Sequence, residues 1–383
     1  MKSPNSGPST NPPAVGSVDF IPQIQPYFDD KELEQITEVV QSTFITENKK
    51  TEEFLEIIKN ITGAKYAIAV GNGTLALIAT LLAEGIGAGD EVIVPNLTFI
   101  ASANAVKIVG AEPIFCDVCR ETGCMRPEDF LPLVTDKTKC VMPVHLYGLA
   151  SPMREIVAAA KERGLIVIED AAEAFGMRDN GQHMGTFGEY GTFSFFANKT
   201  ITCGEGGVIL TNSEARYKKL YRVKNHGRNR KGIFIHEEIG YNFCFTDLQA
   251  AIGVAQLQKF DLLQQLKKRN FEFYQNAFAG NPAIQLVEPA EHIESNYWFV
   301  NILVDNTERL AEKLLAANIQ TRRFFYPLNR QPCFQSDIDN RDRSYPNTNW
   351  LFDHGLSIPS GAGLTLAELE YVAQQVIKCV KEN

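Results

Sequence analysis

Residues 66–74, Tyr-Ala-Ile-Ala-Val-Gly-Asn-Gly-Thr, decide which class of fold this chain can adopt. A short apolar run leads into a glycine-containing turn, and apolar residues then recur at helical spacing from Leu75 to Leu82. An uninterrupted apolar run of this length predicts a strand buried on both faces, as in a mostly parallel sheet. The stretch therefore predicts a strand, a turn and a helix in succession.

The same alternation of strand-length apolar runs and helical stretches continues on both sides of this segment. Further strands are predicted over residues 91–95, 113–116, 141–147, 165–169, 192–196 and 207–211. Helices are predicted over residues 51–61 and 247–278, and from Asp29-Asp30 onward, where apolar residues recur at helical spacing: Leu33, Ile36, Val39 and Val40. This order predicts an α/β fold with helices on both faces of a mostly parallel sheet.

The chain has 383 residues, of which 44% are apolar, so it can bury one large core and a smaller one. We expect a flexible tail over residues 1–19, because this Ser-, Pro-, Asn- and Gly-rich stretch has no apolar run to bury. A large domain is predicted over 20–264 and a small α+β domain over 265–383. The small domain should contain a strand over 297–304, helices over 307–317 and 365–380, and the run 322–327.

Composition excludes several function classes. The net charge of −9 argues against a nucleic-acid-binding protein, whose affinity depends on cations that neutralise phosphates. No run of about 18 apolar residues is present, so no membrane span is expected, and the N-terminus does not have the pattern of a signal peptide. These features predict a cytoplasmic protein.

Three of the eight cysteines lie close together, at Cys116, Cys119 and Cys124. A metal or redox site is one interpretation, but no second CxxC motif or histidine pair completes a zinc site. Cys116 also ends an apolar run, so a buried strand residue is the favoured interpretation. A chain of this size with this cysteine usage does not predict a disulfide scaffold.

The turn Gly71-Asn-Gly-Thr74 is the first candidate binding site. Backbone N–H groups at the start of a helix attract anions, and glycines let a phosphate approach the backbone closely. The motif is neither a dinucleotide fingerprint nor a Walker loop, so a plain tight turn is the alternative.

The dipeptide Glu169-Asp170 lies at the carboxyl end of the predicted strand over 165–169 and is the second candidate. Ligands of open α/β sheets bind beyond the carboxyl ends of the strands, where a carboxylate can pair with a ring nitrogen. The alternative is an aspartate that caps a helix.

The third candidate is Lys199, which a loop presents after the strand that carries Ser194. A lysine in a pocket that lowers its pKa can act as a nucleophile and then as a base. The glycine-rich stretch over 201–207 is typical of backbone that passes close to a ligand. The alternative is a surface hairpin with a solvated lysine.

The order and spacing of these segments carry more information than each segment alone. GNGT at 71–74, NLTFIAS at 96–102, VHLYG at 144–148, IEDAAEA at 168–174, TFSFFANKTITCGEGG at 192–207 and GYN at 240–242 together resemble the DegT/DnrJ/EryC1/StrS sugar aminotransferases. This family belongs to the fold-type I enzymes that use pyridoxal phosphate (PLP). The resemblance extends from about residue 20 to the C-terminus.

The resemblance assigns roles residue by residue. Lys199 matches the lysine that holds PLP as a Schiff base, and Asp170 matches the partner of the pyridine nitrogen. The family's phosphate-binding positions correspond to Gly73, Thr74 and Ser194. Phe99 matches the aromatic residue that stacks on the cofactor ring.

The remaining matches concern the substrate and the neighbouring subunit. Glu173 falls where members carry His, Gln or Glu near the cofactor. Asn242 matches a residue that reaches the PLP phosphate of the neighbouring subunit, which implies a homodimer with shared active sites; on the residues alone, it could instead cap the helix from Asp247. Phe243 and Cys244 replace a segment that often contains arginine, which puts that contact in doubt.

The implied reaction transfers an amino group from glutamate to a nucleotide-linked keto sugar. The RRFFYP segment at 322–327 favours C-4 of GDP-4-keto-6-deoxymannose, with UDP- and dTDP-linked sugars as alternatives. Candidates for cationic contacts to the diphosphate are Arg228, Arg322 and Arg323, which are otherwise solvated surface charges. Sugar dehydration is a competing reaction, although dehydratases similar to this family replace the lysine with histidine. A PLP-binding regulator and a nicotinamide-binding Rossmann protein are less favoured, because no basic DNA-binding module and no third fingerprint glycine is present.

Overall fold

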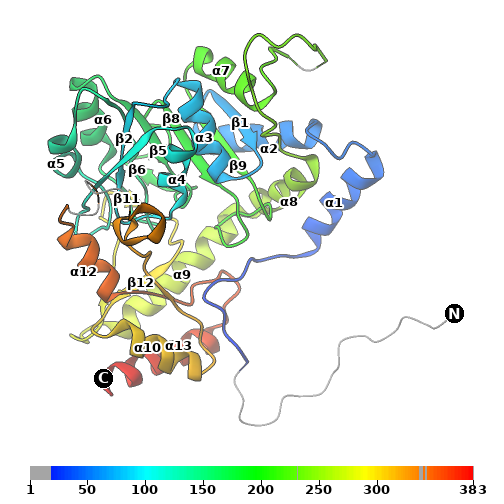
Figure 1. The fold of residues 1–383 in the computed structure, drawn as a ribbon. Helices are drawn as coiled ribbons and strands as arrows, with labels where there is room; N and C mark the ends of the chain where they lie inside the picture. Colours follow the sequence, from blue (N-terminus) through cyan, green and yellow to red (C-terminus); the bar gives the residue numbers. More distant parts are fainter. Residues whose placement is uncertain (1–18, 231, 336–339, 341–342, 383) are drawn as a thin grey trace.

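The computed structural model describes residues 19–230, 232–335, 340 and 343–382. Except for Asp19, the predicted tail lies outside these described residues. Figure 1 shows a large sheet layered between helices and a smaller unit below it, in which helices pack on short strands. In the described part of the chain, no helix combines the length and apolar character needed to span a bilayer.

The large sheet has seven strands in the order β1-β9-β8-β5-β4-β2-β3. Among these strands only β9 runs antiparallel to its neighbours, β1 and β8, so the predicted mostly parallel sheet is confirmed. The strands are β1 (Tyr66–Val70), β2 (Glu91–Pro95), β3 (Glu112–Cys116), β4 (Thr138–Val141), β5 (Ile166–Asp170), β8 (Tyr190–Ser194) and β9 (Gly207–Thr211).

Helices cover both faces of this sheet. Neighbouring residues of a strand point to opposite faces, and the residues on both faces are apolar, so both faces must be covered. In β5, Val167 packs in the core formed with α2, α6 and α8, whereas Ile168 packs in the core formed with α3, α4 and α7. The helices are α1 (Asp30–Ser42), α2 (Lys49–Thr62), α3 (Gly73–Ala83), α4 (Ala101–Ile108), α5 (Pro127–Phe130), α6 (Met153–Glu162), α7 (Glu214–Lys224) and α8 (Asp247–Gln258), with the 3-10 turn η1 (Leu131–Leu133).

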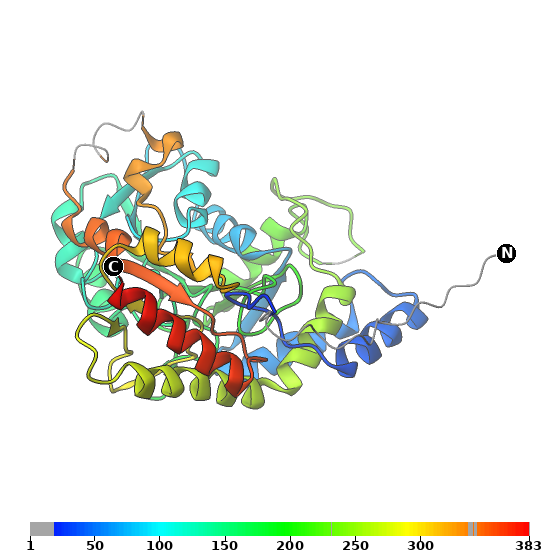
Figure 2. The same ribbon diagram turned by 90° about the horizontal axis from the view of Figure 1, so that it is seen from below.

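The C-terminal unit contains a four-stranded antiparallel sheet in the order β10-β12-β14-β13. Its strands are β10 (Gln285–Leu286), β12 (Val300–Leu303), β13 (Arg322–Arg323) and β14 (Gly355–Ile358). Its helices are α9 (Phe260–Phe278), α10 (Thr307–Ala316), α12 (Pro346–His354) and α13 (Leu366–Lys381), with the 3-10 turns η2 (Leu328–Arg330) and η3 (Pro332–Phe334). Seen from below in Figure 2, α9, α10 and α13 lie together with β14. A third sheet joins β11 (Ile293–Glu294) to β6 (Arg178–Asp179) and β7 (Gln182–His183).

Two elements differ from the sequence-based expectation. The predicted helix over 247–278 is two helices, because Lys259 leaves helical geometry between α8 and α9. Its buried ammonium lies 2.7 Å from Glu32 Oε1 and 3.0 Å from Asp29 Oδ1. The predicted strand over 141–147 ends at Val141, and the following residues form an irregular segment in which Tyr147 has φ 58°.

The N-terminal segment packs on the C-terminal unit, although the prediction assigned residues 20–264 to the large domain. Ile21 forms a β-bridge with Ile319 and lies in the same core as Phe271 and Leu314. Within α9, Leu263 packs in the core of the large sheet, whereas Phe271 packs in the core of the smaller unit. The boundary at residue 264/265 stays a prediction that falls inside one continuous helix.

The apolar residues predicted to bury one side of α1 are only partly covered. Val39 is buried, but Leu33 is 67% exposed and Val40 is 55% exposed. The helix itself forms as predicted, because Asp29 and Glu32 make a capping box at its start. Leu33 and Val40 therefore leave an apolar face of α1 uncovered by the rest of this chain.

Candidate functional site

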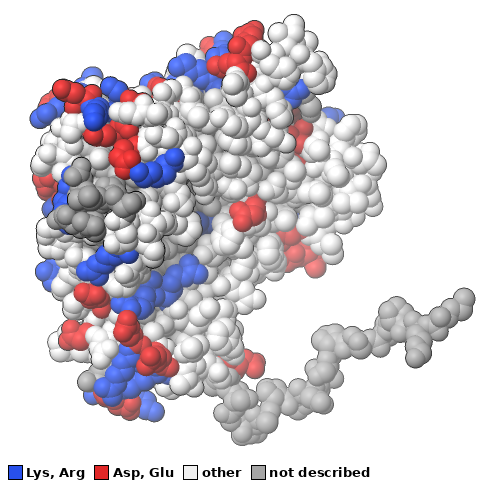
Figure 3. Space-filling model, in the orientation of Figure 1, with Lys and Arg blue, Asp and Glu red and all other residues white. Residues whose placement is uncertain are grey.

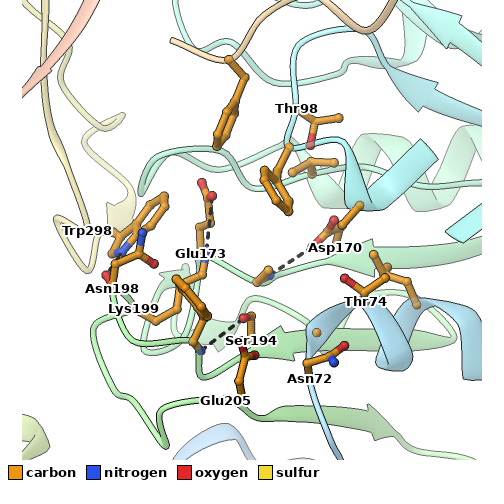
Figure 4. Close-up of a pocket in the computed structure, with 18 of the residues that line it drawn as sticks. Asn72, Thr74, Thr98, Asp170, Glu173, Ser194, Asn198, Lys199, Glu205 and Trp298 are labelled. Carbon is orange, nitrogen blue, oxygen red and sulfur yellow. Dashed lines mark hydrogen bonds and ion pairs between the residues drawn. The ribbon is translucent and has the colours of Figure 1, made fainter. Parts of the chain in front are cut away.

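A cavity of about 490 Å³ lies where the carboxyl ends of β5 and β8 meet the amino end of α3. The C-terminal unit closes another side of this cavity with Trp298, Arg322 and Phe325. Eight residues singled out from the sequence line it: Gly73, Thr74, Phe99, Asp170, Glu173, Ser194, Lys199 and Arg322. Figure 4 shows Lys199 and Trp298 on one side of the space, Asp170 and Thr74 on the other, and Glu173 between them.

The amino end of α3 forms an anion-binding surface in this cavity. Asn72 caps the helix, and its Oδ1 accepts a hydrogen bond of 2.9 Å from the N–H of Leu75. The N–H groups of Gly73 and Thr74, at the first turn, have no partner within the helix and carry its positive dipole end. A Cβ at position 73 would lie 2.9 Å from the Cβ of Ser194, so glycine leaves room that any side chain would fill. The predicted glycine turn is therefore the start of a helix, and its backbone N–H groups can be approached closely by a phosphate.

Asp170 ends β5 with its carboxylate in the cavity wall. Its Oδ2 accepts a hydrogen bond of 2.7 Å from Ser102, and its Oδ1 accepts one of 3.2 Å from the N–H of Ala172. Burial raises the pKa of Asp170, while these two donors and the positive charge of Lys199 act in the opposite direction. No helix begins after Asp170, so the alternative role as a helix cap does not apply.

Lys199 projects into the same cavity from the loop after β8. Its side chain is only 13% exposed, unlike the solvated surface lysine that was the alternative prediction. Its Nζ lies 3.4 Å from Glu173 Oε1 and 4.1 Å from the ring centroid of Trp298. The other oxygen of Glu173 accepts a hydrogen bond of 2.7 Å from the N–H of Tyr147. Burial raises the pKa of Glu173, and the charge of Lys199 opposes this shift.

Phe99 supplies an aromatic face beside this polar set. Its side chain is 54% exposed, and its ring centroid lies 5.6 Å from that of Phe325. An exposed ring at the wall of a cavity can stack on a planar ligand. Phe99 therefore lines the cavity, and its stacking on the cofactor ring stays a prediction.

Three predicted residues do not line the cavity. Asn242 is exposed, pairs with Asn225 through a β-bridge and does not cap α8, which Thr246 caps instead. Arg228 donates hydrogen bonds to Asn225. Arg323 pairs with Glu308 on the opposite face of β13 from Arg322, because neighbouring strand residues point to opposite faces.

Several residues in or behind the cavity wall were missed by the sequence reasoning. Ser102 supports Asp170 and stood inside a quoted motif, so a search for hydroxyl partners of the carboxylate could have found it. Asn198 and Phe325 stood inside quoted segments but were not singled out, and Trp298 gave no signal, because its position depends on how the C-terminal unit docks. Within the described residues, the buried side-chain oxygens of Asn198 and Thr200 have no hydrogen-bond partner.

The cavity residues fit a planar cofactor with three distinct ends. The α3 cradle with Thr74 and Ser194 suits a phosphate, the Asp170 carboxylate suits a protonated ring nitrogen, and the Lys199 amine suits an aldehyde. The missing Cβ at Gly73 leaves the approach to the cradle open. The donor set therefore matches PLP.

Glu169 supports the site from inside the large domain. Its buried carboxylate accepts hydrogen bonds of 2.7 Å from the N–H groups of Gly185, Phe187 and Gly188. Its Oε2 also lies 3.1 Å from Nε2 of His145, whose Nδ1 accepts the N–H of Ser151. Nε2 therefore carries the proton and donates to Glu169, which ties the loop after β7 and the loop after β4 to β5.

Replacing Glu169 with leucine should lower the free energy of unfolding by about 3–5 kcal/mol, because three buried N–H donors lose their acceptor. Urea unfolding followed by circular dichroism measures this loss. Glu162→Leu, at the exposed end of α6, is the control and should change stability by less than about 0.5 kcal/mol. Equal stability of the two variants would show that the Glu169 network does not hold these loops.

Comparison with known proteins supports the family resemblance that the sequence motifs gave. Residues 26–377 match the DegT/DnrJ/EryC1/StrS aminotransferase family. The chain is 39% identical over 361 residues to GDP-perosamine synthase of Escherichia coli O157:H7, covering 93% of this chain and 98% of that one. It is 35% identical over 372 residues to GDP-perosamine synthase of Vibrio cholerae, with 94% and 98% covered. Its fold matches the X-ray structure of the aminotransferase from Psychrobacter cryohalolentis with a TM-score of 0.89, 29% identity and coverage of 95% and 99%.

Proposed function

Because the chain belongs to the DegT/DnrJ/EryC1/StrS aminotransferase family, we propose that it transfers an amino group from L-glutamate to C-4 of GDP-4-keto-6-deoxymannose. The enzyme is a PLP-dependent sugar aminotransferase. The observation that carries the reaction type is the meeting of Lys199, Asp170 and the α3 phosphate cradle in one cavity. The sugar is proposed from the likeness to the GDP-perosamine synthases, whose product is a GDP-linked amino sugar by name.

Binding and orientation of the cofactor are the task of five residues. Gly73, Thr74 and Ser194 would hold the phosphate through N–H and hydroxyl donors, and Phe99 would support the ring face. Asp170 would keep a proton on the ring nitrogen, since an ionised carboxylate there favours the charged form of its partner. When bound, PLP supplies an aldehyde carbon for amino exchange and a ring that accepts electrons.

Proton movement is the task of Lys199. Its Nζ would bind the cofactor covalently at rest and, once displaced by glutamate, take the proton from the α-carbon of the donor. Glu173, 3.4 Å away, holds the freed amine in the cavity. The same amine would deliver protons in the reverse half of the exchange, when the keto sugar receives the amino group.

The walls supplied by the C-terminal unit limit the access of water and shape the substrate end of the cavity. Arg322 is the candidate contact for the diphosphate, because it is the predicted arginine that lines the cavity. Arg228 and Arg323 would have to act outside this subunit's cavity, and Arg323 is already paired with Glu308.

A substrate screen tests the proposed sugar. The purified enzyme should aminate GDP-4-keto-6-deoxymannose with glutamate at a kcat/KM at least about 100-fold above that for UDP- or dTDP-linked 4-keto sugars, because polar groups that bind the base reject analogues strongly. Mass spectrometry detects the amino sugar, and NMR shows which carbon carries nitrogen. Faster amination of a UDP- or dTDP-linked sugar would contradict the proposed carrier, and loss of oxygen without amination would identify a dehydratase.

We further propose that two copies form a homodimer with shared active sites. Figure 3 shows few charged side chains over the half of this face that carries α1 and the loop after α7. Large apolar side chains are exposed there: Leu33, Val40, Phe44, Ile45, Phe234, Ile235 and Ile239. Asn242 follows this loop, is exposed and does not line its own cavity, which supports a role across the interface. Sedimentation equilibrium should give twice the 42.6 kDa chain mass, and a monomer at active concentrations would contradict the proposal.

A cytoplasmic location is also proposed. Buried thiols such as Cys116, Cys124 and Cys203 form no disulfide, which is typical of proteins from reducing compartments.

A further inference from the structure

Trp298 joins the C-terminal unit to the catalytic loop at two points. Its buried indole ring lies under the amine of Lys199, with 4.1 Å between Nζ and the ring centroid. Its Nε1 donates a hydrogen bond of 2.8 Å to the carbonyl of Asn198, the residue before the lysine. One side chain therefore contacts both the charge of Lys199 and the backbone that carries it.

The backbone of Trp298 is fixed from both sides. Its N–H donates to Asn296 Oδ1 at 3.1 Å, and the amide nitrogen of Asn296 donates to the carbonyl of Glu173 at 2.8 Å. Its carbonyl accepts a hydrogen bond of 2.8 Å from Nζ of Lys267, a buried residue of α9. Lys267 is only 3% exposed, so little water reaches this junction, and this burial lowers the pKa of Lys267 to about 7. The preceding residue, Tyr297, has φ 47°, a conformation that non-glycine residues adopt only when the surroundings impose it.

We propose that Trp298 is a positioning residue that holds the free amine of Lys199 in the cavity and stabilises its protonated form through the indole face. The face of an indole ring is negative and attracts an ammonium group, most strongly where water is excluded. A flexible lysine that is released from a covalent bond must stay in place for the proton transfers that follow. This inference rests on the proposed catalytic role of Lys199.

The other charged groups around this amine do not change in the test. Glu173 lies closest, Asp170 contributes from the end of β5, and Glu205 and Arg322 line the cavity from the loop before β9 and from β13. Because every variant keeps these four groups, a shift in the titration of Lys199 can be assigned to the loss of the indole, which acts through its ring face and its Nε1–H.

The experiment measures the protonation of Lys199 directly by competitive labelling with acetic anhydride. The full-length protein, stripped of cofactor, is labelled across a pH series, and mass spectrometry of the Lys199 peptide gives the midpoint of its titration. Trp298→Leu should lower this midpoint by about 0.5 to 1 pH unit, because the ammonium form loses its aromatic partner. Trp298→Phe keeps a weaker ring face and should give an intermediate midpoint.

Trp350→Leu is the matched control, because it makes the same replacement at the chain's other tryptophan, which packs on Arg120 away from the cavity. It should leave the Lys199 midpoint unchanged. If Trp298→Leu does not fold, as judged by circular dichroism, the comparison of Trp298→Phe with the unmodified protein decides. An unchanged or raised midpoint in the folded Trp298 variants overturns the inference. The result does not depend on the sugar, so a wrong substrate assignment would leave the titration shift intact.

Discussion

Lys199→Ala should lower the rate of amino transfer by at least about 10⁴-fold, because one side chain supplies both the covalent link and the proton transfers. The amine lies 3.4 Å from Glu173 in a cavity that offers no second lysine among its described lining residues. The purified variant should also lack the visible absorbance of a lysine-bound cofactor. Absorption spectroscopy and an amino-transfer assay measure the two losses.

One further variant separates the amine from its charge, and a second variant is the control. Lys199→Arg keeps a positive charge but presents a guanidinium, which does not act as a nucleophile, so it should be as inactive as the alanine variant. Lys218→Ala, on the exposed surface of α7, should retain full activity. Full activity of Lys199→Ala would remove the basis of the proposed function.

Asp170→Asn should lower the rate of proton abstraction by about 10- to 100-fold and leave cofactor binding largely intact. The amide has nearly the same shape, so the cradle at α3 and Lys199 can still hold the cofactor. It lacks the negative charge that keeps a proton on the ring nitrogen, and a hydrogen bond to a charged group contributes about 1.5–3 kcal/mol. Single-turnover reaction with glutamate, followed by absorbance, measures the rate.

Ser102→Ala is the graded control for Asp170. It removes the hydroxyl that donates to Oδ2 at 2.7 Å but leaves the carboxylate and the N–H of Ala172 in place. Its effect should be several times smaller than that of Asp170→Asn. Kinetics of Asp170→Asn that match those of the unmodified enzyme would refute the assigned role of the carboxylate.

The elements of the large sheet could be predicted because burial on both faces leaves a local mark. Each strand of a parallel sheet must be apolar on both faces, so Glu91–Pro95 was found with its observed bounds. The predicted bounds were wrong where a contact with a distant residue accompanies a change in backbone conformation. Lys259, at the break between α8 and α9, forms a buried ion pair with Glu32, a distant partner that no local pattern reveals.

The site residues follow the same division. Asp170 and Ser194 lie at the carboxyl ends of β5 and β8, and such ends gather at one edge of a sheet, so their meeting was predictable. The roles given to Phe99 and Glu173 came from the family resemblance. Arg322 and Arg323 could not be told apart, because the face that each one takes is fixed only when β13 pairs with β14.

By itself, the sequence determined the order of strands and helices, the chemical groups at the strand ends and the family to which they belong. These properties are local, because hydrophobic periodicity and turn residues act over a few neighbouring positions. Only the tertiary structure decided that Ile21 packs in the C-terminal unit and that Trp298 lies against Lys199. Such contacts join residues far apart in the chain, and close packing between two units selects them without leaving a periodic pattern in either segment.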